Sequence, residues 1–336
     1  MDKKGKNNVI FAVLLVLLVL TAVISIALGR YPIPVRDVIK TFIPLSSAGK
    51  IADSVVARIV LDIRLPRVIM ACIIGASLSV AGCTYQAVFH NPMASPDILG
   101  ASSGACFGAA LGILLGLPYY AVVLLAFAIS LFTIVFVYFI NLFAKDRSLV
   151  SILLAGIVVG SVFSSATSYI KLVADPGNQL PQISYWLMGS LAGAKKSQTM
   201  IALAICAFGM LPLLILRWRM NYLTLPEDEA KSMGVNVRIL RGTVVLCATL
   251  LTALSVAFAG MIGWVGLAVP HLCRFLVGNN LKKLIPVCMV MGSLFLLVID
   301  DISRNLLSVE IPIGILTAFV GAPFFITLLV TGMKRV

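Results

Sequence analysis

A polar loop over residues 217–241 holds the residues best suited to contact a partner outside a membrane. Proline fits the first turn of a helix, acidic side chains favour the positive end of its dipole, and glycine commonly ends a helix. The loop therefore predicts a short helix, amphipathic through one alanine and one methionine, although it fits a solvated connector as well. The residues that would form it are Pro226, Glu227, Glu229, Ala230, Met233 and Gly234.

Three arginines form a second set that could recognise a partner. Arg64 and Arg67 open one apolar run, and Arg304 closes another run on the same predicted side of the membrane. Arginines at membrane ends commonly extend to lipid headgroups. They could equally form a cationic rim that docks an acidic protein. The sequence leaves both alternatives open.

Two irregular stretches interrupt the apolar runs. One is a turn with two prolines, and the other precedes an apolar piece near 268–277 that is too short to cross a membrane alone. Prolines with Asn and Ser make a stiff, hydrogen-bonding turn, and such backbone is tolerated at membrane depth only inside protein or beside a water-filled cavity. Our candidates for translocation or gating come from these stretches: Gln86, Asn91, Pro92, Gly263, Pro270, His271 and Arg274.

The chain lacks several motifs that catalysis, metal binding and nucleotide binding commonly use. The chain has no GxxxxGK[ST] phosphate loop, no HExxH and no CxxC, and its two histidines, His90 and His271, are far apart in sequence. We therefore expect no catalytic residue, no metal site and no cofactor bound by this chain. Asp97, Asp300 and Asp301 fall near the predicted ends of spans, whereas ion-coupled carriers need a buried acid. Energy for pumping should then come from another subunit.

The composition places the chain in a lipid bilayer. It has 336 residues, of which 60% are hydrophobic and 12% charged, and its mean hydropathy is +1.08. A hydrocarbon core about 30 Å thick needs ~20 apolar residues per helix, and spans must be helical because lipid cannot satisfy a bare backbone. The net charge of +13 would suggest nucleic acid in a soluble chain. Here the basic residues flank apolar runs, so we expect no nucleic acid.

We predict an all-α polytopic membrane protein with about ten transmembrane helices in one domain, residues 1–336. The first run could be a signal peptide, but the many later runs favour an uncleaved helix. Both ends of the chain are basic, so the positive-inside rule places both termini in the cytoplasm, which ten crossings satisfy. The predicted spans are 9–28, 66–86, 98–116, 119–143, 149–170, 199–216, 242–265, 268–277, 284–302 and 312–332.

Glycines recur every four residues in two of these spans. Small residues at this spacing let helix backbones approach closely, which drives association inside a membrane. We interpret them mainly as packing positions, and a face lining a pathway is the alternative. These glycines are Gly100, Gly104, Gly108, Gly112, Gly156 and Gly160.

Several strings together resemble the iron-chelate and cobalamin (FecCD-type) permease family, the membrane subunits of type II ATP-binding-cassette importers. The match runs from Arg64 almost to the end of the chain. It departs at Trp264, where the family more often has Phe, and at the doubled Asp300-Asp301. The strings are Arg64-Leu-Pro-Arg67, Gly75-Ala76, Gly82, Gln86, Asn91-Pro92, Pro96, Gly100, Gly263 to Arg274, Gly278, Asp301 to Arg304, Ile311 to Gly314, Thr317 and Gly321 to Phe324.

This resemblance implies a permease in a bacterial cytoplasmic membrane. Two copies, or one copy and a paralogue, would work with two ATPase subunits, which use ATP and Mg, and with an extracytoplasmic substrate-binding protein. Arg64, Arg67 and Arg304 would meet glutamates of that protein, and the segment 226–238 would be the coupling helix. The substrate would be a ferric siderophore, or else haem or cobalamin. A stand-alone secondary transporter is the alternative, with a membrane transferase as a weaker one.

Overall fold

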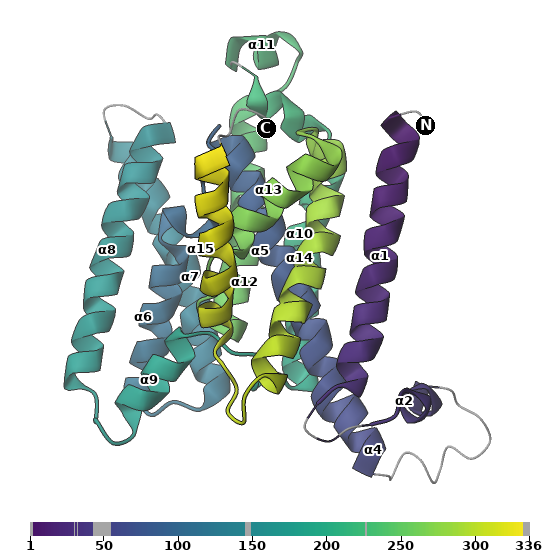
Figure 1. Cartoon of the computed structure of the whole chain (residues 1–336). Coiled ribbons are helices and arrows are strands. Elements are labelled where there is room, and N and C mark those ends of the chain that lie inside the picture. The colour runs from purple at the N-terminus through teal and green to yellow at the C-terminus, as the bar shows by residue number, and fades with distance from the viewer. Residues whose placement is uncertain are drawn as a thin grey trace.

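The computed structural model describes residues 3–29, 31, 33–42, 55–144, 149–225 and 227–331, and every regular element among them is helical (Figure 1). The elements, in chain order, are α1 Lys3–Ala27, α2 Val35–Phe42, α4 Val55–Arg58, the π-helical η1 Ile59–Arg64, α5 Leu65–Val88, the 3-10 turn η2 Pro96–Leu99, α6 Ala101–Leu114, α7 Tyr119–Phe143, α8 Leu149–Val173, α9 Gln179–Leu187, α10 Lys196–Leu216, the 3-10 turn η3 Arg219–Thr224, α11 Glu227–Ser232, α12 Val237–Ala259, α13 Val265–Val277, α14 Leu281–Asn305 and α15 Ile313–Thr331.

The ten predicted spans correspond to ten of these helices. Within the described ranges, 7 helices are long and apolar enough to cross a membrane. The remaining three predicted spans are the shorter apolar helices α6, α13 and α15. The sequence did not predict α2, α4, η1 or α9, which are short and lie outside the apolar runs. The prediction of an all-helical polytopic membrane protein is confirmed.

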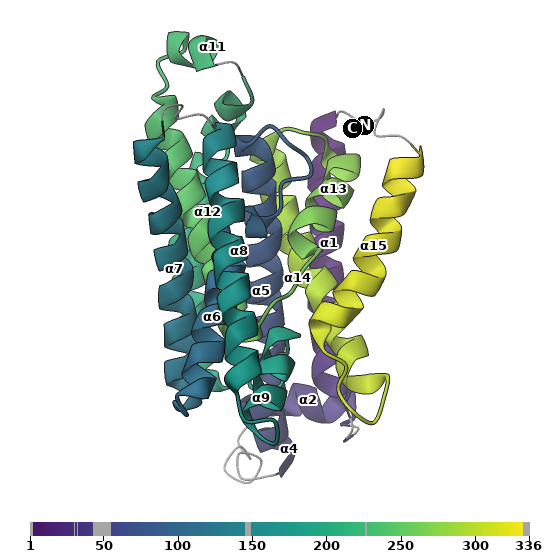
Figure 2. The ribbon, with the colours of Figure 1, turned by 90° about the vertical axis from the view of Figure 1, so that its left-hand side faces the viewer.

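The chain begins and ends at the same end of the molecule. Figures 1 and 2 place the start of α1, the end of α15 and α11 together, while α2, α4 and α9 lie at the opposite end. The α11 end also carries basic residues that follow α10 or begin α12 and α14, among them Arg217, Arg238 and Lys282. The positive-inside rule makes this the cytoplasmic end.

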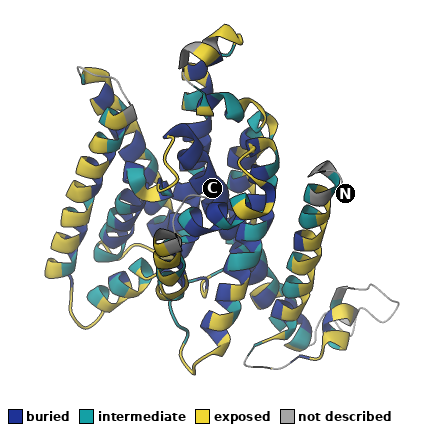
Figure 3. Cartoon of the chain, turned by 45° about the horizontal axis from the view of Figure 1, so that its top comes forward, coloured by how far each residue is buried: buried dark blue, intermediate teal, exposed yellow. Residues whose placement is uncertain are grey.

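Helix α5 lies at the centre of the bundle because small residues let its neighbours approach. A Cβ built on Gly75 would lie 2.1 Å from the carbonyl oxygen of Gly292 in α14, so these two helices touch backbone to backbone. Without a hydrophobic driving force between helices in lipid, such close packing is what holds them together. Figure 3 shows buried residues concentrated in the central helices, and exposed ones along the outer helices α1 and α8.

The turn after α5 re-enters the membrane layer. Pro96 lies against Gly266, where an added Cβ would be 2.4 Å from the Pro96 ring and 2.8 Å from the carbonyl oxygen of Leu78. Leu78 is ten residues before the end of α5, which is about 15 Å of helix. Asp97 precedes α6 and so falls at the end of a span, as predicted, but this end lies well inside the bundle. The sequence could not show this because the re-entry depends on a contact with α13.

The chain breaks a second time between α12 and α13. Residues 260–264 are not helical, Gly260 and Trp264 have φ of 70° and 69°, and α13 starts only at Val265. A positive φ is unusual for a bulky residue such as tryptophan. Gly321 of α15 makes room for it, since an added Cβ would be 2.5 Å from the Trp264 Cβ. The short piece predicted near 268–277 is thus the second half of a broken element.

The predicted packing glycines lie at helix contacts. An added Cβ on Gly104, Gly108 or Gly112 would meet α7, at Thr133, at Leu125 and Ala126, and at Val122. Gly100, Gly156 and Gly160 lie together where the re-entrant turn meets α8. These contacts set the position of the re-entrant turn along α8.

Candidate functional site

The predicted cytoplasmic helix is present as α11, Glu227–Ser232. Ala230 is buried, and the amide of Val235 donates to its carbonyl at 3.3 Å. Gly234 has a φ of 76°, in the left-handed region that suits glycine at a helix end. The side chain of Met233 is 58% exposed at the tip of the molecule. Pro226 lies outside the described residues, as does the side chain of Glu227, whereas Glu229 is exposed.

The three arginines lie at the outer end, but they do not form an exposed rim. Arg64, Arg67 and Arg304 are 5%, 8% and 7% exposed. Arg64 donates to the carbonyl oxygens of Ile26 at 2.7 Å and Ala27 at 2.8 Å, which fastens the end of α1 to the start of α5. Each of these side chains therefore has partners within its own chain, and their role in docking stays a prediction.

Arg67 lies between two carboxylates. It contacts Asp300 at 2.9 Å, and its two terminal nitrogens reach the two oxygens of Glu310 at 2.9 and 3.1 Å. Asp300 is fully buried, whereas the Glu310 side chain is 26% exposed. Two-point pairing of this kind gives both strength and a defined geometry. The pair with Glu310 joins α5 to the loop that precedes α15.

Arg304 completes this outer charge cluster. Its guanidinium pairs with Asp301 and donates at 2.6 Å to the carbonyl oxygen of Ser25 in α1. The Ser25 hydroxyl also donates to Asp301 at 2.8 Å. The adjacent Asp300 and Asp301 thus pair mainly with two different arginines, Arg67 and Arg304. The cluster links α1, α5 and α14 at the outer membrane face.

Four of the seven translocation or gating candidates surround one cavity of about 490 Å³ at the cytoplasmic end. Gln86 from the end of α5, Pro92 from the turn, and His271 and Arg274 from α13 form part of its wall. Helix α14 contributes Leu281 to the wall, and η3, which precedes α11 in the chain, contributes Thr224. The sequence named these residues singly, and the fold brings them together because α5 and α13 pack through their glycines.

The other three candidates do not reach this cavity wall. The Asn91 side chain accepts from the amide of Met93 at 2.8 Å and so shapes the turn. The carbonyl of Gly263 accepts from Val265 at 2.9 Å at the start of α13, in which Pro270 is buried. His90, which the sequence analysis did not choose as a gating residue, does line the cavity and contacts the carbonyl oxygen of Leu223 at 2.5 Å.

A hollow of about 450 Å³ lies halfway along the bundle, between the re-entrant turn and α8. Asp97 and Ser103 face it from one side. Ser161, Ser164 and Ser165 face it from α8 and are exposed in the single chain. Ser102 donates a hydrogen bond to the Asp97 carboxylate. Exposed hydroxyls at membrane depth do not suit contact with lipid tails. The sequence analysis offered a pathway-lining face on these helices only as the alternative to packing, and it did not place Asp97, Ser161 or Ser165 on that face.

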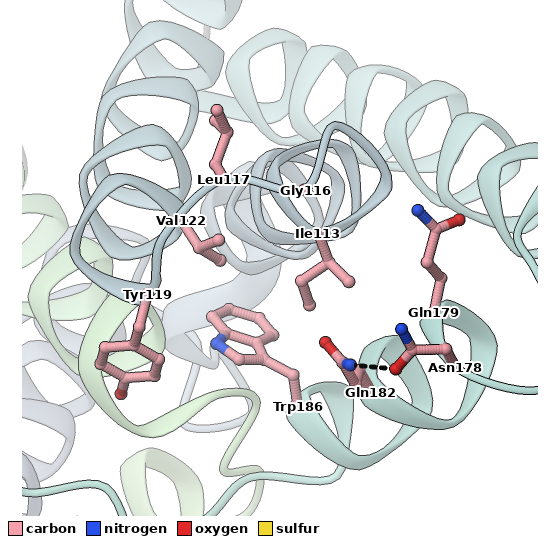
Figure 4. Close-up of a pocket in the computed structure, with 9 residues that line it drawn as sticks. All are labelled: Ile113, Gly116, Leu117, Tyr119, Val122, Asn178, Gln179, Gln182 and Trp186. Atoms are coloured by element: carbon pink, nitrogen blue, oxygen red, sulfur yellow. Dashed lines mark hydrogen bonds between the residues drawn. The ribbon is translucent and has the colours of Figure 1, made fainter.

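A third cavity, about 400 Å³ in volume, opens at the outer end among α6, α7 and α9. Figure 4 shows Tyr119 and Trp186 on one side of it and the amides of Asn178 and Gln182 on the other, joined by a hydrogen bond of 2.6 Å. No helix had been predicted at α9, so this wall was not foreseen. Among the described residues, no group of three or more His, Cys, Asp or Glu side chains could hold a metal ion.

The family model of the FecCD transport family matches residues 17–331. The chain belongs to the FecCD transport family. A FecCD relative from Haemophilus influenzae, named molybdate import system permease protein MolB, is 38% identical over 322 residues, 96% of this chain and 95% of that one. A probable iron chelatin transport system permease protein from Helicobacter pylori is 38% identical over 271 residues, 81% of this chain and 82% of that one.

A solved structure supports the FecCD fold as well. It is described as an inward-facing conformation of a putative metal-chelate type ABC transporter. Its TM-score is 0.87 at 36% sequence identity, and the match covers 96% of this chain and 99% of that one. The chain is therefore a multi-pass membrane permease component of the ABC importer class.

Proposed function

We propose that this chain is the permease through which an ABC importer moves a metal chelate, a ferric siderophore first and haem or cobalamin next, from a binding protein to the cytoplasm. The observation that carries the proposal is the hydroxyl-lined hollow between the re-entrant turn and α8. Its wall offers serine hydroxyls and glycine backbone, with no arginine, lysine or histidine among the described lining residues. Such a wall binds weakly, and a pathway must release what it binds.

The charge of the hollow supports a chelate over a bare oxyanion. Asp97 is an exposed residue of this wall, and a partner copy that faced this surface would add a second aspartate. Like charges repel most strongly where water is scarce. A relative of this chain is named for molybdate, so the substrate has to be tested directly. Neutral or cationic chelates rich in hydrogen-bond donors suit this wall better.

The two ends of the molecule support the arrangement of partners. At the cytoplasmic end, α11 projects beyond the bundle (Figure 2) and is followed by the exposed Met233, as a segment that enters a cleft of an ATPase would be. At the outer end, the half-exposed Glu310 and its partner Arg67 lie where a substrate-binding protein would dock. We infer a complex of two permease copies or paralogues, two ATPases and one binding protein, with all ATP chemistry in the ATPases.

Uptake by the reconstituted complex tests the substrate assignment. Proteoliposomes containing permease and ATPases, with binding protein outside and ATP inside, would receive labelled ferric siderophore, haem, cobalamin and molybdate in parallel. The proposal expects ATP-dependent accumulation of a chelate and little molybdate. Preferential accumulation of molybdate would reject the chelate assignment, and the permease role itself would stand.

A further inference from the structure

The 490 Å³ cavity at the cytoplasmic end combines one fixed positive charge with no negative one. Arg274 is the only arginine or lysine of its described wall, and no aspartate or glutamate lines it. Helix α14 starts at the wall, at Leu281, and the positive end of its dipole lies there, followed by Lys282 and Lys283. The cavity therefore favours an anion.

Two residues of this wall have polar atoms without a partner. Gln86 is only 3% exposed, and its Oε1 makes no hydrogen bond within the described part of the chain. Its Nε2 lies 3.4 Å from the carbonyl oxygen of Gly266, which requires a donor and so fixes which end of the amide is the acceptor. Nη1 of Arg274 is likewise shielded and unpartnered. Buried polar groups in native proteins are rarely left so.

The two histidines add acceptors to the same wall. His90 Nε2 contacts the carbonyl oxygen of Leu223 at 2.5 Å, and His271 Nδ1 contacts that of Leu267 at 3.2 Å. Because a carbonyl only accepts, these nitrogens carry the protons. In a ring that carries a single proton, the other nitrogen is an acceptor. The wall thus places a cationic donor beside amide and imidazole groups that can accept.

We propose that this cavity binds a small anion that also carries a hydroxyl group, with the chemistry of monohydrogen phosphate or a phosphate monoester. An anionic oxygen would accept from Nη1 of Arg274, and the hydroxyl would donate to Oε1 of Gln86. Sulfate and molybdate at neutral pH have the charge but no hydroxyl, so they can accept from Arg274 but cannot donate to Gln86.

The ligand comes from the aqueous phase. Thr224 and Asn279, which border the cavity, belong to connections at the cytoplasmic end and are exposed. A lipid phosphate has related chemistry but would have to enter from the side of the bundle. The proposal does not depend on which chelate is transported. An anion in this cavity would join α5, α13, α14 and η3 beside the coupling segment.

The test uses the full complex with its ATPases in nanodiscs of phosphatidylcholine and measures binding of radiolabelled phosphate. We expect saturable binding in the millimolar range or tighter, on the order of 1 mM. Sulfate should compete at least about tenfold less well, and Arg274→Gln should weaken phosphate binding by at least about tenfold, because a hydrogen bond to a charged group is lost. Lys196→Gln removes an exposed lysine that lies outside the wall and outside the segment 226–238, and it should leave phosphate binding unchanged.

A second variant separates the hydroxyl contact from the charge. Gln86→Met keeps the approximate volume but removes the acceptor, so phosphate and sulfate should then compete equally. Thermal melting of each variant reports whether it folds. Absence of saturable binding, or unchanged binding and selectivity in both variants, would overturn the proposal. So would binding that is lost when phosphatidic acid is added to the nanodiscs, or binding seen only after the ATPases are removed, because a headgroup or an ATPase side chain would then be the occupant.

Discussion

Gly82 of α5 and Gly266 of α13 are in direct backbone contact. A Cβ added to Gly82 would fall 1.8 Å from the carbonyl oxygen of Gly266. The same carbonyl accepts from Gln86, and the Gly266 Cα faces the ring of Pro96. This contact therefore fixes three things at once: the second half of the broken element, the re-entrant turn, and the wall of the cytoplasmic cavity.

Replacing Gly82 by alanine should destabilise the bundle. The new methyl group cannot fit without separating α5 from α13, and overpacking of this kind costs about 1–3 kcal/mol. Thermal melting of the purified permease would measure it as a lower Tm. Gly242→Ala in α12 is the matched control, because a Cβ built at that position meets no neighbouring atom within 4 Å. Equal melting of both variants would show that the helices are not packed as described.

The buried carboxylate Asp300 should matter far more to stability than Glu310. Asp300→Ala leaves Arg67 in a buried site without its inner partner, and breaking a buried ion pair costs about 3–5 kcal/mol. Glu310→Gln keeps that inner pair and loses only a partly exposed one. Asp300→Ala should therefore have a much lower Tm than Glu310→Gln in thermal melting curves. The reverse order would contradict the geometry of the cluster.

The same glutamate provides a test of docking. If Arg67 meets a carboxylate of the binding protein, Glu310 competes with that carboxylate in the free permease. Glu310→Gln should then tighten binding-protein association several-fold, most clearly at low salt, where screening is weak. Surface-based binding measurements at two salt concentrations would show it. An affinity that neither rises nor depends on salt would reject a docking role for Arg67.

Two changes in and beside α11 test coupling. Glu229→Arg reverses an exposed charge, and Gly234→Pro removes the φ of 76° that the chain needs there, since proline fixes φ near −65°. Both should abolish ATP-driven uptake and weaken ATPase association, while the bundle melts as before. Co-purification with the ATPases measures association. Full uptake in both variants would mean that α11 transmits nothing.

Asp97 should discriminate against anions in the central hollow. Asp97→Asn removes the repulsion, and a change of ~1.4 kcal/mol corresponds to about tenfold. Uptake of an anionic solute relative to the chelate should rise by roughly that factor. Ser161→Ala, on the opposite wall of the hollow, keeps the charge and should leave this ratio unchanged. A ratio unaffected by Asp97→Asn would place the pathway elsewhere.

The sequence predicted the spans well because each is an uninterrupted apolar run whose length matches a bilayer. It also predicted α11, since Glu229 and Gly234 mark a helix locally. What failed depended on contacts between distant segments. The depth of Asp97 follows from Pro96 against Gly266, and the burial of Arg67 follows from Asp300 and Glu310, more than 230 residues away. No local pattern reveals such partners.

The candidate site shows the same division. Gln86, Pro92, His271 and Arg274 were each recognisable by type, but only the packing of α5 on α13 shows that they share one cavity. The serine face of α8 was visible as Ser161, Ser164 and Ser165 in the sequence. The exposure of these serines, on which their assignment to a pathway wall depends, follows only from the fold.

The most direct test of the account is uptake by the purified permease in proteoliposomes with and without its ATPase partners. The binding protein and labelled chelate would be outside, and a proton or sodium gradient would be imposed in the ATPase-free sample. We predict accumulation only when the ATPases and internal ATP are both present. Uphill transport by this chain alone, driven by an ion gradient, would contradict the central claim that it is a conduit moved by a separate motor.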